Sequence, residues 1–173
     1  MRKRVETVEG EYPERKSKSA EQALSALMRY AAKAERSSGD AMRLMRRWNV
    51  PEQERAGVLE RLVAMHFIDD ERYARAYVRE KSSLSSWGIH KIRSGLRGKG
   101  VAKDIVELAL EQLPSDNSRL VELLERKLGN IKGGTAYEVK GKLFRFGMSR
   151  GYGYDEVSEA VDKVMESFTD SRG

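Results

Sequence analysis

The residues of this chain that could do chemistry are few and lie close together. His66, Asp69 and Asp70 are close enough in the sequence to suggest a metal site. However, a single histidine provides too few nitrogen ligands, and both aspartates can instead stabilise the start of a helix. Residues 95–100 resemble a phosphate loop, yet the Gly-Lys-Ser/Thr ending is absent and no strand precedes them. His90 has no nearby carboxylate to orient it, and no nucleophile–base pair is evident by spacing. The sequence therefore predicts a protein without catalytic residues, metal or cofactor.

The composition narrows the class of protein further. The chain has 173 residues and no cysteine, which excludes disulfides and thiol chemistry and is compatible with a reducing compartment such as the cytoplasm. The N-terminus has no apolar run behind it, so no signal peptide is expected, and no stretch approaches the length of a membrane span. A net charge of +6 mildly favours an anionic partner.

A well-capped packing helix is predicted after residue 68. Asp69 is a good N-cap, and Asp70 and Glu71 place negative charge in the first turn, where the helix dipole favours it. Ile68 and Tyr73 have the spacing of a hydrophobic staple across this cap. One apolar face recurs at helical spacing and consists of Tyr73, Ala74, Tyr77 and Val78. We expect the tyrosines to belong to the core rather than to stack on bases.

A basic amphipathic helix is predicted next, over residues 86–98. Ser86 can cap it, and Gly98 and Gly100 can supply left-handed stops. Its apolar side consists of Ile89, Ile92 and Leu96. Arg93 and Arg97 lie one turn apart, and residues 82–101 contain four Lys or Arg and no acid. We therefore expect both arginines to contact a partner; for Arg93, packing against an Asp or Glu elsewhere is the alternative.

These two helices carry a resemblance to a known family. The stretch resembles the signature of the RecX regulators of the bacterial recombinase RecA: an aromatic or Leu pair, Asp-Asp-x-Arg-Tyr/Phe-Ala, then Gly…Ile-Arg-x-x-Leu-x-x-Lys-Gly-Val. The matching residues are Phe67, Ile68, Asp69, Asp70, Arg72, Tyr73, Ala74, Gly88, Ile92, Arg93, Leu96, Lys99, Gly100 and Val101. The chain departs from this pattern at Gly95, where relatives usually have a helix former. A glycine inside a helix costs about 1 kcal/mol relative to Ala, so this helix must depend on tertiary packing.

The helical pattern recurs along the chain. A shift of 51 residues lays residues 46–50 over 97–101, and a looser third copy places Leu143 over Leu96 at a shift of 47. We expect an all-α fold of three tandem three-helix repeats in an elongated, curved array, as the resemblance also implies. The expected divisions are a flexible, charged arm at 1–18, repeats at 19–66, 67–115 and 116–168, and a tail at 169–173.

Charge is distributed unevenly among the predicted helices. The second helices of the three repeats carry net charges of +2, +4 and +3, whereas the third helices carry −1, −3 and −5. In a stacked array equivalent helices fall on one side, so this pattern predicts one basic and one acidic face. The candidate partner-contact residues are Arg43, Arg46, Arg47, Lys91, Arg93, Arg97, Lys99, Lys140, Lys142 and Arg145.

The resemblance implies a function for the basic face. It implies a monomeric regulator, not an enzyme, that binds along the RecA–DNA filament and modulates, most often inhibits, recombinase and ATPase activity during recombination and repair. Direct contact with single- or double-stranded DNA is left open. The alternative is an autonomous, sequence-independent DNA-binding protein built from helix-turn-helix-like units. The helix over 86–98 begins Ser-Trp-Gly-Ile, which is poor for reading bases, and this favours the filament regulator.

Overall fold

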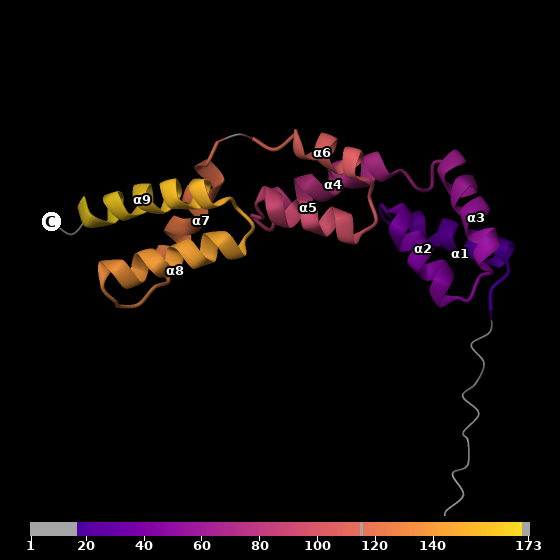
Figure 1. Cartoon of the computed structure of the whole chain (residues 1–173), viewed down its shortest axis with the longest axis horizontal. Coiled ribbons are helices and arrows are strands. Elements are labelled where there is room, and N and C mark those ends of the chain that lie inside the picture. The colour runs from indigo at the N-terminus through magenta and orange to yellow at the C-terminus, as the bar shows by residue number, and fades with distance from the viewer. Residues whose placement is uncertain (1–16, 115, 171–173) are drawn as a thin grey trace, which may run out of the picture.

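The computed structural model describes residues 17–114 and 116–170, and the regular structure within these ranges is entirely helical. The helices follow one another along an elongated array (Figure 1). Their bounds are α1 (Ala20–Ala31), α2 (Ser38–Arg47), α3 (Glu52–Ala64), α4 (Asp70–Ser83), α5 (Ile89–Gly98), α6 (Lys103–Leu110), α7 (Ser118–Gly129), α8 (Ala136–Ser149) and α9 (Tyr154–Asp170). The predicted all-α fold is confirmed.

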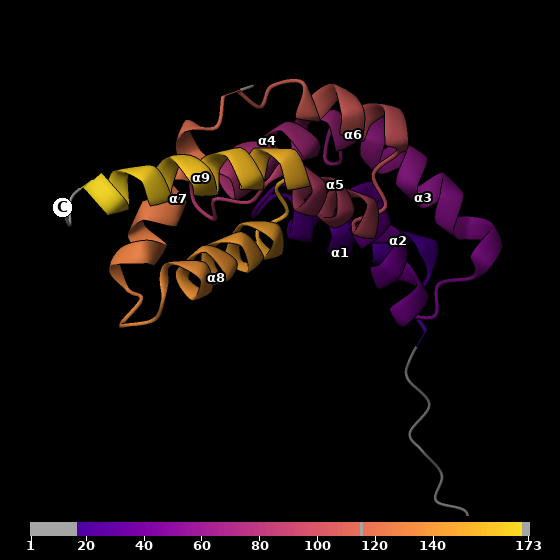
Figure 2. The same cartoon turned by 60° about the vertical axis from the view of Figure 1, so that its left-hand side comes forward.

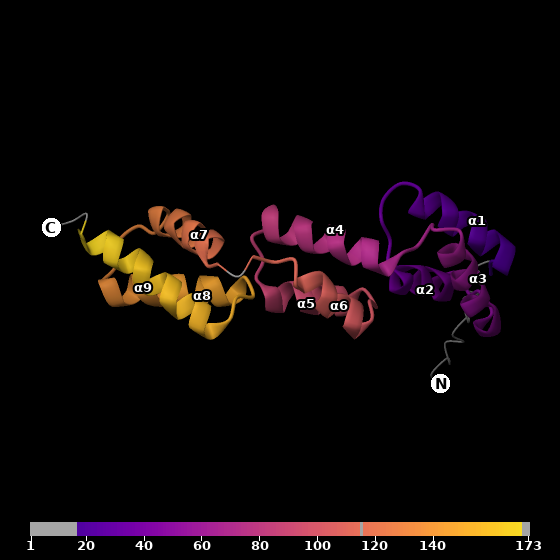
Figure 3. The same ribbon diagram turned by 90° about the horizontal axis from the view of Figure 1, so that it is seen from above.

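Each group of three consecutive helices encloses its own hydrophobic core. Unit 1 (α1–α3), unit 2 (α4–α6) and unit 3 (α7–α9) are centred on separate clusters that include Leu62, Leu96 and Leu143 respectively, each fully buried. Seen from above, the three groups lie in a row (Figure 3). The chain has 39% hydrophobic residues, which is sufficient for this architecture because each unit needs only a small core of its own.

Side-chain caps fix several helix starts, and the predicted cap at Asp69 is one of them. The side chain of Ser37 accepts a hydrogen bond from the N–H of Asp40 at 3.1 Å, and that of Asp69 accepts one from the N–H of Arg72 at 2.9 Å. Thr135 and Glu138 form a reciprocal capping box at α8. These bonds satisfy N–H groups that have no partner inside the helix.

Three local predictions are wrong. Ser86 does not cap α5, because it adopts a positive φ of 51° and the helix begins two residues later behind Gly88. Gly98 is the last helical residue, and only Gly100, at φ +77°, supplies the left-handed stop. Ile68, expected to pack on Tyr73, is buried in the core of unit 1, whereas Tyr73 lies in that of unit 2.

The repeat is more regular than the sequence pattern indicates. The second helices end at C-caps Trp48, Lys99 and Arg150, which are spaced by 51 residues, and the third helices begin at the equally spaced Glu52, Lys103 and Tyr154. The predicted shift of 47 for the third copy is therefore wrong at these positions. The irregularity lies elsewhere, since α8 is four residues longer than α5 and its extra turn, residues 136–139, is at its start.

The chain ends agree only partly with the expected arm and tail. Residues 1–16 of the predicted arm and 171–173 of the tail lie outside the described residues. Lys18, however, is attached to unit 1, because its N–H donates to the carbonyl oxygen of Trp48 at 3.0 Å. Helix α9 continues to Asp170, two residues into the expected tail.

Candidate interaction surface

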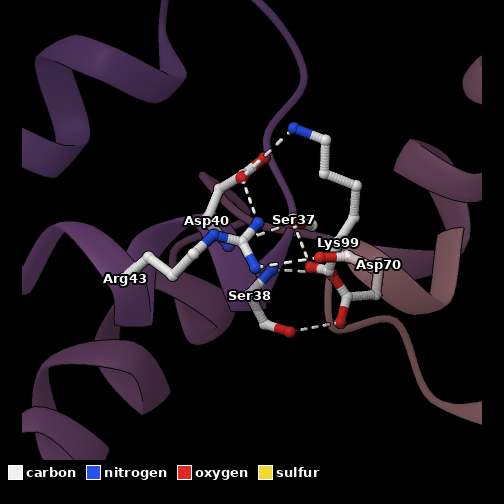
Figure 4. A network of polar contacts seen from close by, with 7 residues as sticks. Ser37, Ser38, Asp40, Arg43, Asp70 and Lys99 are labelled. Atoms are coloured by element: carbon white, nitrogen blue, oxygen red, sulfur yellow. Dashed lines mark hydrogen bonds and ion pairs between the residues drawn. The ribbon is translucent and has the colours of Figure 1, made fainter. Parts of the chain in front are cut away.

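The first junction of the array joins the start of α2 to the end of α5 (Figure 4). The hydroxyl of Ser37 donates to the carbonyl oxygen of Lys99 at 2.7 Å. Ser38 is held by Asp70, whose Oδ1 accepts from the Ser38 N–H at 2.8 Å and whose Oδ2 accepts from the Ser38 hydroxyl. Main-chain groups at the start of α2 and at the end of α5, which have no partner within their helices, thus find hydrogen-bond partners in the neighbouring unit. Asp70, a residue of the signature, therefore stabilises this junction.

Two glycines allow the main chains to touch at this junction. A Cβ on Gly39 would lie 2.2 Å from the carbonyl oxygen of Lys99, and a Cβ on Gly100 would lie 2.8 Å from the Cα of Gly39. Gly100 also adopts a φ of +77°, which strains residues with a side chain. The glycine pair therefore sets the distance between units 1 and 2.

Charged side chains surround the same contact (Figure 4). Asp40 has a side chain only 14% exposed and accepts from Arg43, while the ammonium of Lys99 lies 3.4 Å away. Burial opposes ionisation of Asp40, but its hydrogen bond and charge interactions with Arg43 and Lys99 prevail and lower its pKa. Arg43 also donates to the carbonyl oxygen of Gly98 at 3.0 Å, so two candidate contact cations are used inside the molecule.

The signature arginine makes a further link between the two units. The Nε atom of Arg72 lies 2.7 Å from a carboxylate oxygen of Glu35 in unit 1, and this hydrogen bond raises the pKa of Arg72. Its Nη2 atom donates to the carbonyl oxygen of His66 at 3.2 Å. Arg72 therefore has a structural role in holding α4 against unit 1.

The second junction repeats the first between α5 and the end of α8. The N–H of Gly88 donates to the carbonyl oxygen of Arg150 at 2.8 Å, and the N–H of His90 donates to that of Gly151 at 3.0 Å. Gly151 adopts a φ of +85°, and a Cβ there would lie 2.3 Å from the Cβ of Lys91. Ser37 and Gly88 are the equivalent N-caps, while Lys99 and Arg150 are the equivalent C-caps.

The two junctions place α8, α5 and α2 end to end in one row, as Figure 2 shows from the side. The C-terminus of α8 faces the N-terminus of α5, and the C-terminus of α5 faces the N-terminus of α2. Opposite ends of adjacent helix dipoles therefore meet, which is favourable. At the far end of α2, Lys18 occupies the place of a further unit by donating to the carbonyl of Trp48.

Half of the candidate contact cations are engaged within the molecule. Arg93 forms a bidentate pair with Glu107 of α6, with two contacts of 2.9 Å, and Lys140 lies 2.6 Å from Asp162 of α9. Lys91 donates to the carbonyl oxygen of Ser149 at 3.2 Å. The other two are Arg43 and Lys99, described above. For Arg93, the structure thus bears out the packing alternative, because the acid absent from its own segment comes from the next helix.

The remaining candidates form what we call the basic face: Arg46, Arg47, Arg97, Lys142 and Arg145. All five are exposed, and four of them make no ion pair in the described part of the chain. Arg97 has only a contact of 3.9 Å to Glu107. Each lies away from the buried seam of its helix, and Arg46 and Arg97 occupy equivalent positions 51 residues apart. The same exposed cation thus recurs in units 1 and 2, whereas Lys142 and Arg145 of unit 3 align with Lys91 and Ser94 of α5.

The other signature residues are located in cores and junctions. Ala74, Ile92 and Leu96 are fully buried in unit 2, where Tyr73 is 8% exposed. The departure from the signature at Gly95 also has a reason in packing. A Cβ there would lie 2.2 Å from the hydroxyl oxygen of Tyr77, so glycine makes room for this ring against α5.

Several important positions were not identified from the sequence. Ser38, Gly39 and Glu35 hold unit 2, and Lys18 covers the end of α2, yet none of these has a local motif. The 51-residue repeat could have indicated the junctions themselves, because it aligns Ser37 with Gly88 and Lys99 with Arg150. In the described ranges, no group of His, Asp and Glu could hold a metal ion, and no helix is long and apolar enough to cross a membrane.

Comparisons with known proteins agree with this architecture. Residues 69–110 match the family model for the second three-helix domain of RecX, and residues 115–161 match that for the third. The regulatory protein RecX of Prosthecochloris aestuarii is 32% identical over 108 residues, covering 62% of this chain and 70% of that protein. Its counterpart from Clostridium botulinum (strain Alaska E43 / Type E3) is 36% identical over 104 residues, covering 58% and 48%. The chain matches about half the length of its clostridial relatives.

Solved structures show the same fold. The crystal structure of RecX from Lactobacillus salivarius superposes with a TM-score of 0.75 at 20% identity, covering 84% of this chain and 96% of that one. A second crystal structure of a regulatory protein RecX gives 0.76 at 21% identity, covering 83% and 73%.

Three stacked three-helix units, with structural roles for the signature residues, define a helical-repeat protein. The family models together match half of the chain, and the similarity to the Prosthecochloris aestuarii protein, of which 70% is covered, agrees with them. The chain belongs to the RecX family of regulatory proteins.

Proposed function

We propose that this chain binds along the RecA–DNA filament through its basic face and lowers the ATPase and recombinase activity of RecA. The proposal assigns no reaction to the chain itself. It places the chain in the cytoplasm as a monomer that acts during recombination and DNA repair.

The observation that carries the proposal is the series of exposed cations along the row of second helices. Arg46 and Arg97 are equivalent residues in adjacent units, and Lys142 and Arg145 extend the basic face onto unit 3. A filament presents the same acidic groups at regular intervals. Several weak contacts made together by one ordered array bind far more tightly than any one alone.

The structure disfavours the alternative of autonomous helix-turn-helix-like units. Such proteins present the N-terminal residues of a recognition helix to base edges in the major groove. Here the first turn of α5 is occupied, since Gly88 and His90 donate to carbonyl groups at the end of α8. The first turn of α2 is likewise held against α5 through Ser37.

The test measures RecA-driven ATP hydrolysis on single-stranded DNA with substoichiometric amounts of the chain. The variant Arg46→Glu/Arg97→Glu should lose most of its inhibition, because two attractive contacts become repulsive. The matched control is Lys103→Glu/Lys163→Glu, which makes the same change in net charge on α6 and α9 and should inhibit normally.

Two results would oppose the proposal. One is a well-folded Arg46→Glu/Arg97→Glu variant that inhibits at wild-type concentrations. The other is tight, filament-independent binding of the chain to duplex DNA, which would support the helix-turn-helix alternative.

A further inference from the structure

Unit 3 contains a groove lined by aromatic and basic side chains. It lies between α8 and the start of α9, has a volume of about 740 Å³, and combines three aromatic rings with three cations. The rings belong to Tyr137, Phe144 and Tyr154, and the cations to Lys140, Lys142 and Arg145.

Two of the three rings in this groove are largely exposed to solvent. Tyr137 is 87% exposed and Tyr154 is 66% exposed. Tyr154 meets Phe144 edge-on, with ring centroids 5.1 Å apart and an interplanar angle of 69°. An edge-to-face pair of this kind leaves ring faces available for a planar ligand.

Comparison with unit 2 shows how the groove is opened. At the 51-residue spacing, Phe144 replaces Arg93 and Ser158 replaces Glu107, so the bidentate ion pair that closes this place in unit 2 is absent from unit 3. Tyr154 similarly replaces Lys103. The extra first turn of α8 adds Tyr137 to the rim.

The charges around the groove favour an anionic ligand. Lys142 and Arg145 make no ion pair among the described residues, whereas Lys140 contacts Asp162 at 2.6 Å. Glu138, the one acid in the lining, is engaged by the capping box, accepting from the N–H of Thr135 at 2.8 Å. Arg145 and Lys142 thus lie beside exposed ring faces, and the one lining acid whose charge Lys142 meets, Glu138, is held by its own capping box.

We propose that this groove binds unpaired bases of a single-stranded nucleic acid, with the rings stacking on bases and Lys142 and Arg145 contacting phosphates. Ring faces beside cations are the combination that single-strand binding uses, because every base has a π-face and every nucleotide a charge. Paired bases inside a duplex offer no free faces, and an acidic peptide would leave the rings unused. Binding at this groove does not require RecA, so it can be tested separately from binding to the filament.

The test measures fluorescence anisotropy of the full chain alone, with a labelled oligothymidine and with an abasic oligonucleotide of the same length. Both probes carry the same phosphates, so stacking predicts tighter binding of oligothymidine by about tenfold or more. The variant Tyr137→Ala/Tyr154→Ala should abolish this preference, while Tyr137→Phe/Tyr154→Phe should retain it. Circular dichroism establishes that both variants are folded.

A second pair of measurements separates the other possible ligands. Lys142→Ala/Arg145→Ala should weaken binding of both oligonucleotides and reduce its salt dependence by about two phosphate contacts. Equal affinity for the oligothymidine and abasic probes would overturn the proposal, as would tighter binding of polyglutamate or of a duplex than of oligothymidine. A Tyr137→Ala/Tyr154→Ala variant with unchanged base preference would also overturn it.

Discussion

The hydroxyl of Ser37 donates a 2.7 Å hydrogen bond to the main-chain carbonyl of Lys99, joining residues 62 positions apart in the sequence. The last carbonyl groups of a helix have no hydrogen-bond partner within it. The Ser37 hydroxyl supplies such a partner at the end of α5. Gly88 and Arg150 make the equivalent bond at the next junction, with a main-chain donor in place of the hydroxyl. The second junction is thus joined through main-chain groups, whereas the first also uses the side chains of Ser37 and Asp70.

Substitution of Gly39 by Ala should separate units 1 and 2. The new Cβ would lie 2.2 Å from the Lys99 carbonyl oxygen, which is main chain and cannot rotate away. We expect a lower melting temperature and faster hydrogen exchange at the Gly39–Gly100 contact. Gly57→Ala is the matched control, because nothing lies within 4 Å of its Cβ. Its gain in helix propensity should stabilise the protein by up to about 1 kcal/mol. Equal melting temperatures for the two variants would contradict the close contact.

The first junction should weaken in acid through Asp40. Its pKa in the folded state lies below the ordinary value of 3.8, so its stabilising contribution is present above that pH and is lost as the pH falls below it. The free energy of unfolding, measured with urea, should therefore differ between wild type and Asp40→Asn at pH 6. This difference should shrink at pH 3; a constant difference would show that ionised Asp40 is not what stabilises the junction.

Tyr73→Ala should cost about 3–5 kcal/mol of stability, because its ring is buried in the core of unit 2. Burial also raises the pKa of Tyr73 to about 12, so the phenol should stay protonated well above pH 10. Chemical denaturation measures the first effect and ultraviolet titration the second. Tyr137→Ala, at an 87% exposed position, should change stability by under about 0.5 kcal/mol.

Arg93 and Arg97 should differ in their effects on folding and binding. Arg93→Ala removes a bidentate pair with Glu107 and should lower stability by up to about 1 kcal/mol, whereas Arg97→Ala should be nearly neutral. In the RecA assay the order should reverse, with Arg97→Ala inhibiting less well. Greater destabilisation by Arg97→Ala would contradict this division. Lys99 is a poor binding probe, because it contacts Asp40 at the junction.

Lys18→Pro should destabilise unit 1 by about 1 kcal/mol, because proline has no N–H to donate to the Trp48 carbonyl. Lys18→Ala keeps that N–H and removes only the ammonium, which lies 5.4 Å from the Trp48 ring centroid. Removal of residues 1–16 should leave thermal stability unchanged. Equal stability of the Pro and Ala variants would show that the main-chain bond contributes little.

The sequence was most informative where structure depends on local signals. Asp69 and Thr135 are caps that can be recognised from their own neighbourhoods, and the apolar spacing of Ile92 and Leu96 identifies a buried seam. Fold class and repeat number follow from such signals together with the resemblance. The start of α5 was missed because its N-cap, Gly88, has no side chain and is fixed by a carbonyl 62 residues later.

The contact surface was predicted only in part, for a physical reason. The net charge of a helix can be counted from the sequence, but it does not show which of its cations form ion pairs with acids on a neighbouring helix. Arg93 and Arg97 differ by a single turn, yet Arg93 lies 2.9 Å from Glu107, whereas Arg97 reaches the same carboxylate only at 3.9 Å and is the more exposed of the two. The aromatic groove of unit 3 was missed for a related reason, since Tyr137 and Tyr154 come from different helices and share no sequence motif.

The end-to-end row gives the molecule a direction. Each internal joint pairs a left-handed glycine turn that follows one helix with the N-cap of another, so a unit carrying these two features could be inserted without new joint chemistry. At α8 the Thr135–Glu138 capping box satisfies the first turn within the helix. An array joined in this way could therefore become longer or shorter by the gain or loss of a complete unit of about 50 residues.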